Sequence, residues 1–216
     1  MLAIIVAVLL SLVGPTTHPS GMSDEGFSVE VSRIPRDIAR EMKGVSWHRG
    51  CPVPIRRLRL MLISYHGFDG ERHIGRLVAH KNAVQAFKRA FRSMWRHDFK
   101  LKRMHRIERY GGSDRRSMRR NNTSAFNCRT VAGTNHWSQH AFGRAIDINP
   151  VQNPYVRSDG SVVPRKGERF ADRSRHHKGM IHAGDSTVRA FSRSGWGWGG
   201  YWSSSKDYQH FSATGT

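Results

Sequence analysis

The sequence predicts a small α+β domain, and three observations support this prediction. Its 216 residues are enough for one well-buried domain. Residues 58–65 form a short run rich in Leu, Ile and Met, which is typical of a buried strand. Residues 84–95 instead repeat their apolar side chains at helical spacing. Because strands and helices do not alternate regularly along the chain, we expect an α+β arrangement rather than βαβ units.

In the N-terminal half we expect two helices and two strands joined by a turn. These are, in order, a short helix at 36–43, a strand at 58–65, a turn at 67–75, an extended segment at 76–80 and a second helix. The second helix begins at Asn82, which resembles a capping box together with Gln85. Its apolar stripe is interpreted as part of the core.

The C-terminal half is predicted to hold short strands, one helix and long loops. In order, these are a strand at 102–110, a loop at 111–122, extended segments at 124–129 and 145–148, a long loop at 149–180, a helix at 186–194 ended by Gly195, and strands at 196–202 and 207–211. A loop as long as 149–180 is usually functional or mobile. The tryptophans of the penultimate strand, Trp196, Trp198 and Trp202, are interpreted as packing residues rather than cleft residues.

The N-terminal stretch at residues 2–13 is almost wholly apolar and uncharged. It is short for a membrane span and fits the apolar region of a secretory signal, although no Lys or Arg precedes it and no clear A-x-A site follows it. We therefore expect residues 1–20 to be a signal peptide or an uncleaved N-terminal anchor, followed by a lead-in at 21–46. No later segment is apolar enough to cross a membrane, so the predicted location is secreted or in the cell envelope.

Two cysteines occur, Cys51 and Cys128. In an oxidising compartment a single disulfide between them is the natural interpretation, and two buried free thiols are the alternative. No C-x-x-C pair is present, so the spacing does not indicate a cysteine zinc site.

The net charge of +20 predicts attraction to polyanions. Nucleic acid, anionic lipid and the phosphate-rich and carboxylate-rich bacterial envelope are all candidates. The basic residues cluster locally at 115–116, 119–120 and 173–178, but neither a heptad repeat after a basic region nor zinc-finger spacing is present. We therefore expect a solvated basic surface that attracts anionic cell-envelope polymers, without specific nucleic-acid recognition.

Two histidines and one aspartate are candidate metal ligands: His140, Asp147 and His210. Three protein ligands and one open position are typical of catalytic zinc sites. In one straight strand His140 and Asp147 would face opposite sides, but Gly143 between them permits a turn. The alternative is that Asp147 caps a turn while His140 belongs to an ordinary polar network.

A second carboxylate, Asp207, precedes His210 by three residues. Local bending is needed for both side chains to reach one site, because side chains alternate along a strand. Zinc lowers the pKa of a coordinated water toward about 7, and a neighbouring carboxylate can accept its proton and pass it to a leaving amine. These residues together indicate a metal hydrolase.

Several motifs taken together are similar to a known family. They are Ser138-x-His140-x-x-Gly143-x-Ala145-x-Asp147, the Gly-Trp-Gly-Trp-Gly-Gly-x-Trp segment at 195–202, Asp207-x-x-His210-Phe211, Asn-Thr-Ser-Ala-Phe-Asn-Cys-Arg at 122–129 and Cys-Pro-Val-Pro at 51–54. In their order along the chain, these motifs together resemble the M15 metallopeptidases. This family includes D-alanyl-D-alanine carboxypeptidases and L-alanyl-D-glutamate endopeptidases of bacterial cell walls and phage lysins. The resemblance covers residues 47–211.

The resemblance implies a zinc peptidase domain at 47–216, acting on peptidoglycan stem peptides. It implies Zn²⁺ held by His140, Asp147 and His210, with Asp207 as general acid and base. The resemblance also places Arg129 near a substrate carboxylate or carbonyl oxygen, and Ser138 is expected to form a hydrogen bond that orients His140. The implied fold has a central antiparallel sheet and is shared with Hedgehog signalling domains.

Four questions stay open from the sequence. Arg129 suits a carboxypeptidase and an endopeptidase equally well, so the bond that is cleaved is undecided. A catalytically silent zinc-containing module that binds the cell wall is possible on this fold, although Asp207 argues against it. A basic nucleic-acid-binding protein would need no zinc and would bind with steep salt dependence. Cobalt or manganese can also occupy a site with two His and one carboxylate.

Overall fold

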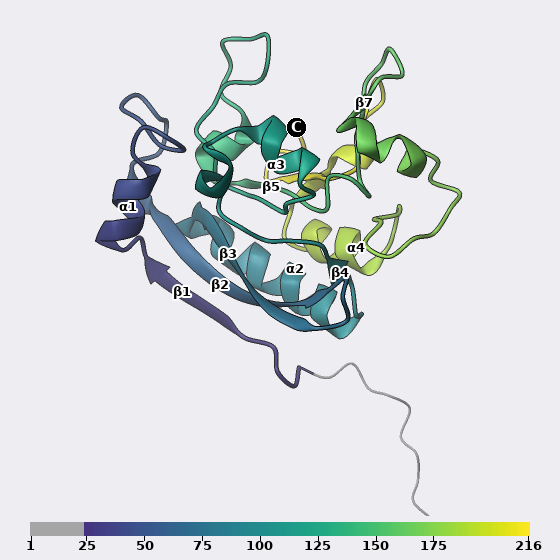
Figure 1. Ribbon diagram of the computed structural model, residues 1–216, viewed down its shortest axis with the longest axis horizontal. Helices are drawn as coiled ribbons and strands as arrows, with labels where there is room; N and C mark the ends of the chain where they lie inside the picture. The colour runs from purple at the N-terminus through teal and green to yellow at the C-terminus, as the bar shows by residue number, and fades with distance from the viewer. Residues whose placement is uncertain (1–23) are drawn as a thin grey trace, which may run out of the picture.

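The computed structural model describes residues 24–216, so the predicted leader at 1–20 lies outside the described residues. As predicted, this part of the chain is α+β, with short helices and mainly antiparallel sheets (Figure 1). Within residues 24–216, no helix has both the length and the apolar character needed to span a bilayer.

The main sheet is formed by β1 (Val29–Arg33), β2 (Leu58–Gly67) and β3 (Arg72–His80), paired antiparallel in that order. The short β4 (Lys100–Leu101) adds in parallel to the end of β2. Strand β2 is buried on both faces, which explains why its sequence is almost continuously apolar rather than alternating. The sequence did not predict β1, and β3 begins four residues before the expected position.

Helix α2 (Val84–Arg96) packs on the inner face of this sheet, and α4 (Ser186–Ser192) packs against α2. The capping prediction for α2 was wrong: the ring Nδ1 of His80 accepts the backbone N–H of Asn82 at 3.2 Å, at the start of the 3-10 turn η2 (Lys81–Ala83). Helix α1 (Arg36–Met42) lies at the other end of the sheet, as Figure 1 shows.

The strands of the C-terminal third of the chain form two small sheets. The first has the order β5 (Ala145–Asp147), β10 (His210–Ser212), β8 (Gly197–Trp198). The second has the order β7 (Val162–Val163), β6 (Tyr155–Val156), β9 (Lys206–Asp207). The remaining elements are α3 (Asp114–Arg119) and the 3-10 helices η1 (Ile55–Arg57), η3 (Ile107–Tyr110), η4 (Gln139–Phe142), η5 (Arg165–Phe170) and η6 (Gly199–Tyr201).

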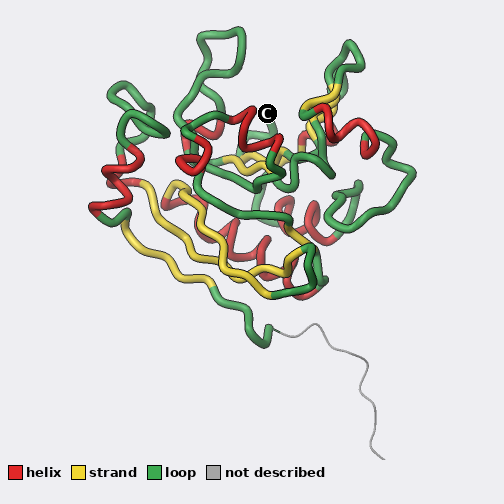
Figure 2. Tube along the Cα trace, in the orientation of Figure 1, coloured by secondary structure: helices red, strands yellow, loops and turns green. Residues whose placement is uncertain are grey.

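Three sequence predictions for residues 102–180 were wrong. Residues 102–110 are not a strand, because β4 ends at Leu101 and the segment continues into η3. Residues 111–122 are not simply a loop, since they contain α3, whose N-terminus is capped by the Ser113 hydroxyl. The long loop at 149–180 contains the β6–β7 pair and η5, although Figure 2 shows that loops still dominate this part of the molecule.

One core joins the main sheet, the two central helices and the small sheet that contains β5. Met61 of β2, Phe87 of α2 and Ile146 of β5 all belong to it. Phe191 of α4 stacks on Phe211 of β10, with ring centroids 4.3 Å apart. Because interiors are close-packed, this contact holds the β5–β10 pair firmly against α4. The metal-ligand candidates lie on that pair and on the turn before it.

Candidate metal centre

The three predicted ligands converge because of one turn and one strand pair. Helix η4 carries His140 and ends at Gly143, whose φ of +63° turns the chain into β5. Asp147 at the end of β5 is the direct antiparallel partner of His210 on β10. Direct cross-strand partners project to the same face of a sheet, so both side chains meet His140 there.

The ligand candidates are close together and almost fully buried. His140 Nε2 lies 3.3 Å from one carboxylate oxygen of Asp147, and His210 Nδ1 lies 3.0 Å from the other. The exposed fractions of His140, Asp147 and His210 are 4%, 5% and 8%. One donor atom from each residue lies within 4.8 Å of the others, a spacing at which a single ion can be shared.

The hydrogen bonds of His140 show that these residues fit a metal ion. Its Nδ1 lies 2.5 Å from the Ala125 carbonyl oxygen, so Nδ1 carries the proton and Nε2 presents a lone pair. Nε2 is buried and has no hydrogen-bond partner among the described residues. A lone pair facing a carboxylate needs a cation between them, and two imidazoles with one carboxylate form a donor set suited to Zn²⁺.

The charges within the cluster reinforce one another. Burial opposes ionisation of Asp147, but the neighbouring imidazoles of His140 and His210 overcome it and lower the Asp147 pKa. Burial likewise disfavours a charged His210, yet its hydrogen bond to Asp147 and the charge of that carboxylate raise the His210 pKa. The aspartate therefore stays ionised, as a metal ligand must be.

Asp207 lies beside the three ligand candidates and lines the same cavity. It is the last residue of β9, and the turn at Tyr208 and Gln209 supplies the bend that the three-residue interval requires. Its Oδ1 is buried and has no hydrogen-bond partner among residues 24–216. Burial, followed by the negative charge of Asp147, raises the Asp207 pKa to about 7. A cation on the three ligands would offset the charge of Asp147 and return Asp207 toward the ionised form that a base requires.

Ser138 is positioned differently from the prediction. Its hydroxyl caps η4 by accepting the backbone N–H of His140 at 3.3 Å, and it does not bond the imidazole ring. The ring is oriented by the carbonyl of Ala125 instead. Nothing in the sequence signalled this partner, because a backbone carbonyl is present at every residue.

Arg129 lies at the cavity wall and forms an ion pair with Asp114 of α3, with 2.7 Å between Nη2 and Oδ2. Its Nε is buried without a hydrogen-bond partner among the described residues. Sequence reasoning did not identify Asp114, because the region around it was interpreted as a loop. Asp114 therefore holds one end of the Arg129 guanidinium at the wall of the cavity.

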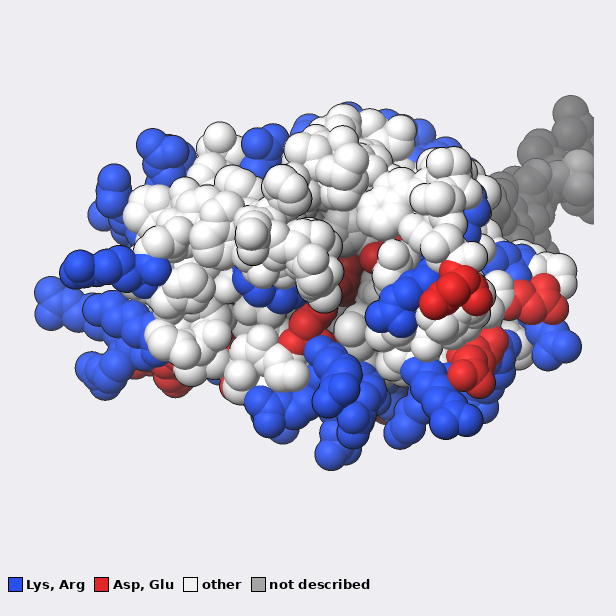
Figure 3. Space-filling view, turned by 90° about the horizontal axis from the view of Figure 1, so that it is seen from above, with Lys and Arg blue, Asp and Glu red and all other residues white. Residues whose placement is uncertain are grey.

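The cavity has a volume of about 460 Å³. Beyond the residues already named, its wall includes Met118, Trp137, Tyr155, Arg157, Trp202 and Gln209. Trp196 and Trp198 are buried packing residues as predicted, whereas Trp202 lines the cleft. Figure 3 looks down on one face and shows acidic side chains inside a central hollow, with Lys and Arg side chains around the rim.

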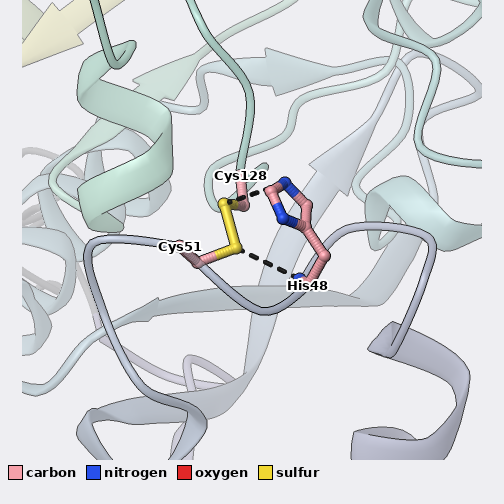
Figure 4. A group of neighbouring side chains, drawn as sticks. All are labelled: His48, Cys51 and Cys128. Atoms are coloured by element: carbon pink, nitrogen blue, oxygen red, sulfur yellow. Dashed lines mark hydrogen bonds between the residues drawn. A yellow bond between two sulfur atoms is a disulfide. The ribbon is translucent and has the colours of Figure 1, made fainter.

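A disulfide between Cys51 and Cys128 closes a sequence separation of 77 residues (Figure 4). His48 contacts both sulfurs: its backbone N–H donates to Cys51 Sγ at 3.1 Å, and its Nε2 lies 3.6 Å from Cys128 Sγ. These three residues are close enough to hold a metal ion, but disulfide sulfurs are not thiolate ligands. The disulfide instead anchors the segment at 122–129, in which Cys128 directly precedes Arg129.

Comparison with known families gives one match. The family model described as D-alanyl-D-alanine carboxypeptidase matches residues 132–213. This match supports an M15 family peptidase. The matched range contains Ser138, the three ligand candidates and Asp207, whereas Arg129 and both cysteines precede it. The comparisons with curated proteins and with solved structures found no match.

The resemblance inferred from the motifs is thereby confirmed at the level of the family. The match supports, at the level of the family, a peptidase of the D-Ala-D-Ala carboxypeptidase type. Its possible metal site is the cluster of His140, Asp147 and His210.

Proposed function

We propose that this M15 peptidase is a zinc-dependent enzyme that hydrolyses an amide bond in peptidoglycan stem peptides. The observation that carries the proposal is the buried His140 Nε2, which faces Asp147 and lacks a partner among the described residues. Asp207 lies beside it, and the Oδ1 of this carboxylate is buried without a hydrogen-bond partner among residues 24–216. Both features suit a catalytic metal site better than a structural one.

When bound, Zn²⁺ supplies a Lewis acid for the amide carbonyl and an acidified water. His140 and His210 would hold the ion through imidazole nitrogens, and Asp147 would hold it through a carboxylate oxygen. Asp207 takes a proton on Oδ1 from the attacking water and delivers it to the departing amine. Arg129 binds the carboxylate of the substrate, or stabilises the carbonyl oxygen as it gains negative charge.

We propose removal of a terminal D-Ala as the reaction, because the family description names this activity and Arg129 offers a cation beside the cavity. Cleavage after L-Ala by the same site is the alternative. The proposal also includes the extent of the peptidase domain (47–216), its Hedgehog-like fold and a location outside the cytoplasm. The Cys51–Cys128 disulfide supports that location, since disulfides persist in oxidising compartments.

Mass spectrometry of a defined stem pentapeptide tests the proposal. The zinc-loaded protein should release one alanine, and a chelator should abolish this release. Cleavage after L-Ala would instead support the endopeptidase. Zinc retention without cleavage of either bond would favour the silent binding module.

Two variants separate metal binding from proton transfer. Asp207→Asn preserves the shape of the side chain but cannot accept a proton, so zinc should stay bound while kcat falls at least about 100-fold. His140→Ala should lose both zinc and activity. Elemental analysis and turnover measured on the same samples provide the comparison. Full activity of the Asp207→Asn protein would overturn the role of Asp207.

A further inference from the structure

A second hollow lies beside the metal cavity and is lined by arginines. It has a volume of about 620 Å³ and is formed by η3, α3 and the residues around them. Its cationic residues and its one aromatic residue are Arg103, Arg109, Arg116, Arg119, Arg120 and Tyr110. We refer to it as the arginine hollow.

Helix α3 separates the arginine hollow from the metal cavity. Asp114 and Met118, four residues apart, line the metal cavity. Arg116 and Arg120, also four apart, line the arginine hollow. Residues at i and i+4 share a helix face, while a step of two residues leads to the opposite side. A helix is about 10 Å wide, so a ligand in the hollow lies about that far from the metal cavity.

The positive charge of the arginine hollow is not neutralised within residues 24–216. None of its five guanidinium groups forms an ion pair with a carboxylate of the described chain. A third hollow, which shares Arg109 with the arginine hollow, differs in this respect, because its Arg106 forms ion pairs with Glu41 and Glu108. Arg103 is held in place by donating to the backbone carbonyl of Arg120 at 2.6 Å. Like charges gathered without counter-charges indicate a site for an anionic ligand.

The residue types indicate phosphate groups repeated along a polymer. Arginine presents paired donors that match phosphate oxygens, and a half-buried tyrosine hydroxyl adds another donor. A single exposed contact contributes little free energy, so several arginines act effectively only on a ligand that carries several charges. An open hollow of about 620 Å³ accommodates more than one phosphate group.

Nucleic acid fits the arginine hollow less well than a phosphodiester chain without bases. Single-stranded nucleic acids are bound by aromatic side chains that stack on successive bases, and the hollow has Tyr110 alone for this purpose. Helix α3 has 6 residues, which is short for an element that reads a DNA groove. We propose that the arginine hollow binds a linear polyol-phosphate polymer and so holds it along α3, next to the metal cavity.

Binding of a labelled poly(glycerol phosphate) oligomer to the full metal-loaded protein tests this proposal. The variant Arg109→Gln/Arg116→Gln/Arg119→Gln removes three exposed charges from the hollow. We expect its Kd at about 0.1 M salt to rise at least about tenfold, with a shallower dependence on salt because fewer phosphates are neutralised.

The matched control is Arg33→Gln/Arg56→Gln/Arg57→Gln, which removes three exposed charges from another basic hollow, of about 590 Å³. Its Kd should change less than about threefold. Equal losses in the two variants would overturn the proposal in favour of diffuse attraction to the net charge. Tighter binding of a single-stranded oligonucleotide or of polyglutamate of matched charge would overturn the choice of ligand.

The inference goes beyond the proposed function and is tested separately from it. None of the substituted arginines contributes to the metal cavity, so both variants should hydrolyse a soluble stem peptide like the parent protein. If neither the parent protein nor the two variants hydrolyse the peptide, the proposed function fails, while the comparison of polymer binding stays valid. If hydrolysis is normal and the hollow variant binds the polymer as tightly as the parent, only the present inference fails.

Discussion

At the scale of single residues, the two ring nitrogens of His140 are distinguished by a backbone group. The carbonyl of Ala125 engages Nδ1, which leaves Nε2 as the candidate ligand atom. The sequence identified His140 as a ligand candidate because of its place in a motif, but a backbone carbonyl has no sequence signature. The same applies to Asp114, whose contact with Arg129 depends on a helix that the sequence did not reveal.

Substitution of Asp114 tests whether Arg129 binds the carboxylate of the substrate. Asp114→Asn keeps an acceptor oxygen for Arg129 and removes the negative charge that competes with a substrate carboxylate. We expect KM for a stem peptide with a free terminal carboxylate to fall about two- to fivefold, the size expected of a partly exposed ion pair. The same peptide with a terminal amide is the control. An equal change in both KM values would contradict binding of the carboxylate by Arg129.

At the scale of elements, the turn between η4 and β5 is the one on which the metal centre depends most. Gly143 has φ +63°, and a Cβ there would lie 2.6 Å from the backbone nitrogen of His80. That nitrogen also donates to the Gly143 carbonyl at 2.9 Å, which joins β3 to the turn. A side chain at this position therefore meets both an unfavourable backbone conformation and rigid backbone atoms.

Gly143→Ala should lower the free energy of unfolding by more than about 2 kcal/mol and should weaken zinc binding. The control is Gly160→Ala, which has φ +81° but no atom within 4 Å of the added Cβ. This control should lose only about 1 kcal/mol and should keep its zinc affinity. Urea denaturation and a zinc competition assay measure the two effects. Equal destabilisation of both variants would show that the contact with His80 is unimportant.

The elements that the sequence predicted well are those with a clear apolar pattern. Strand β2 and helix α2 bury most of their side chains, so their periodicity reflects their surroundings. Helix α3 was missed because Asp-Arg-Arg-Ser-Met-Arg contains no apolar stripe, and its only buried residue is Ser117. Strands β6 and β7 have two residues each, which is too short for any periodicity to be visible.

At the scale of the whole molecule, the net charge of +20 affects how histidines titrate. His80 is 7% exposed, and burial followed by the charges of Arg144 and Arg57 lowers its pKa below the ordinary value of 6.5. Burial and neighbouring arginines lower the pKa of His105 and His182 in the same way. At these three histidines the unfolded chain binds more protons than the folded one below pH about 6.5, so their contribution to stability should fall as the pH falls through this range.

His80→Asn tests this expectation, because asparagine can still accept the N–H of Asn82 but does not titrate. The free energy of unfolding of the parent should drop more between pH 7.5 and pH 5 than that of the variant. Urea denaturation at the two pH values measures the difference. Identical drops in the two proteins would exclude His80 as a source of acid sensitivity.

The amino-acid order alone was sufficient for the α+β class, the resemblance to M15 peptidases and the three candidate metal ligands. This is because short buried strands, amphipathic helices and motif spacings are local properties of a chain. Long-range packing decided the rest: the β5–β10 register that sets Asp147 beside His210, the carbonyl that orients His140 and the placement of an arginine-lined hollow behind α3. Such contacts join residues far apart in the sequence, and their free energy comes from close packing and burial that no local pattern records.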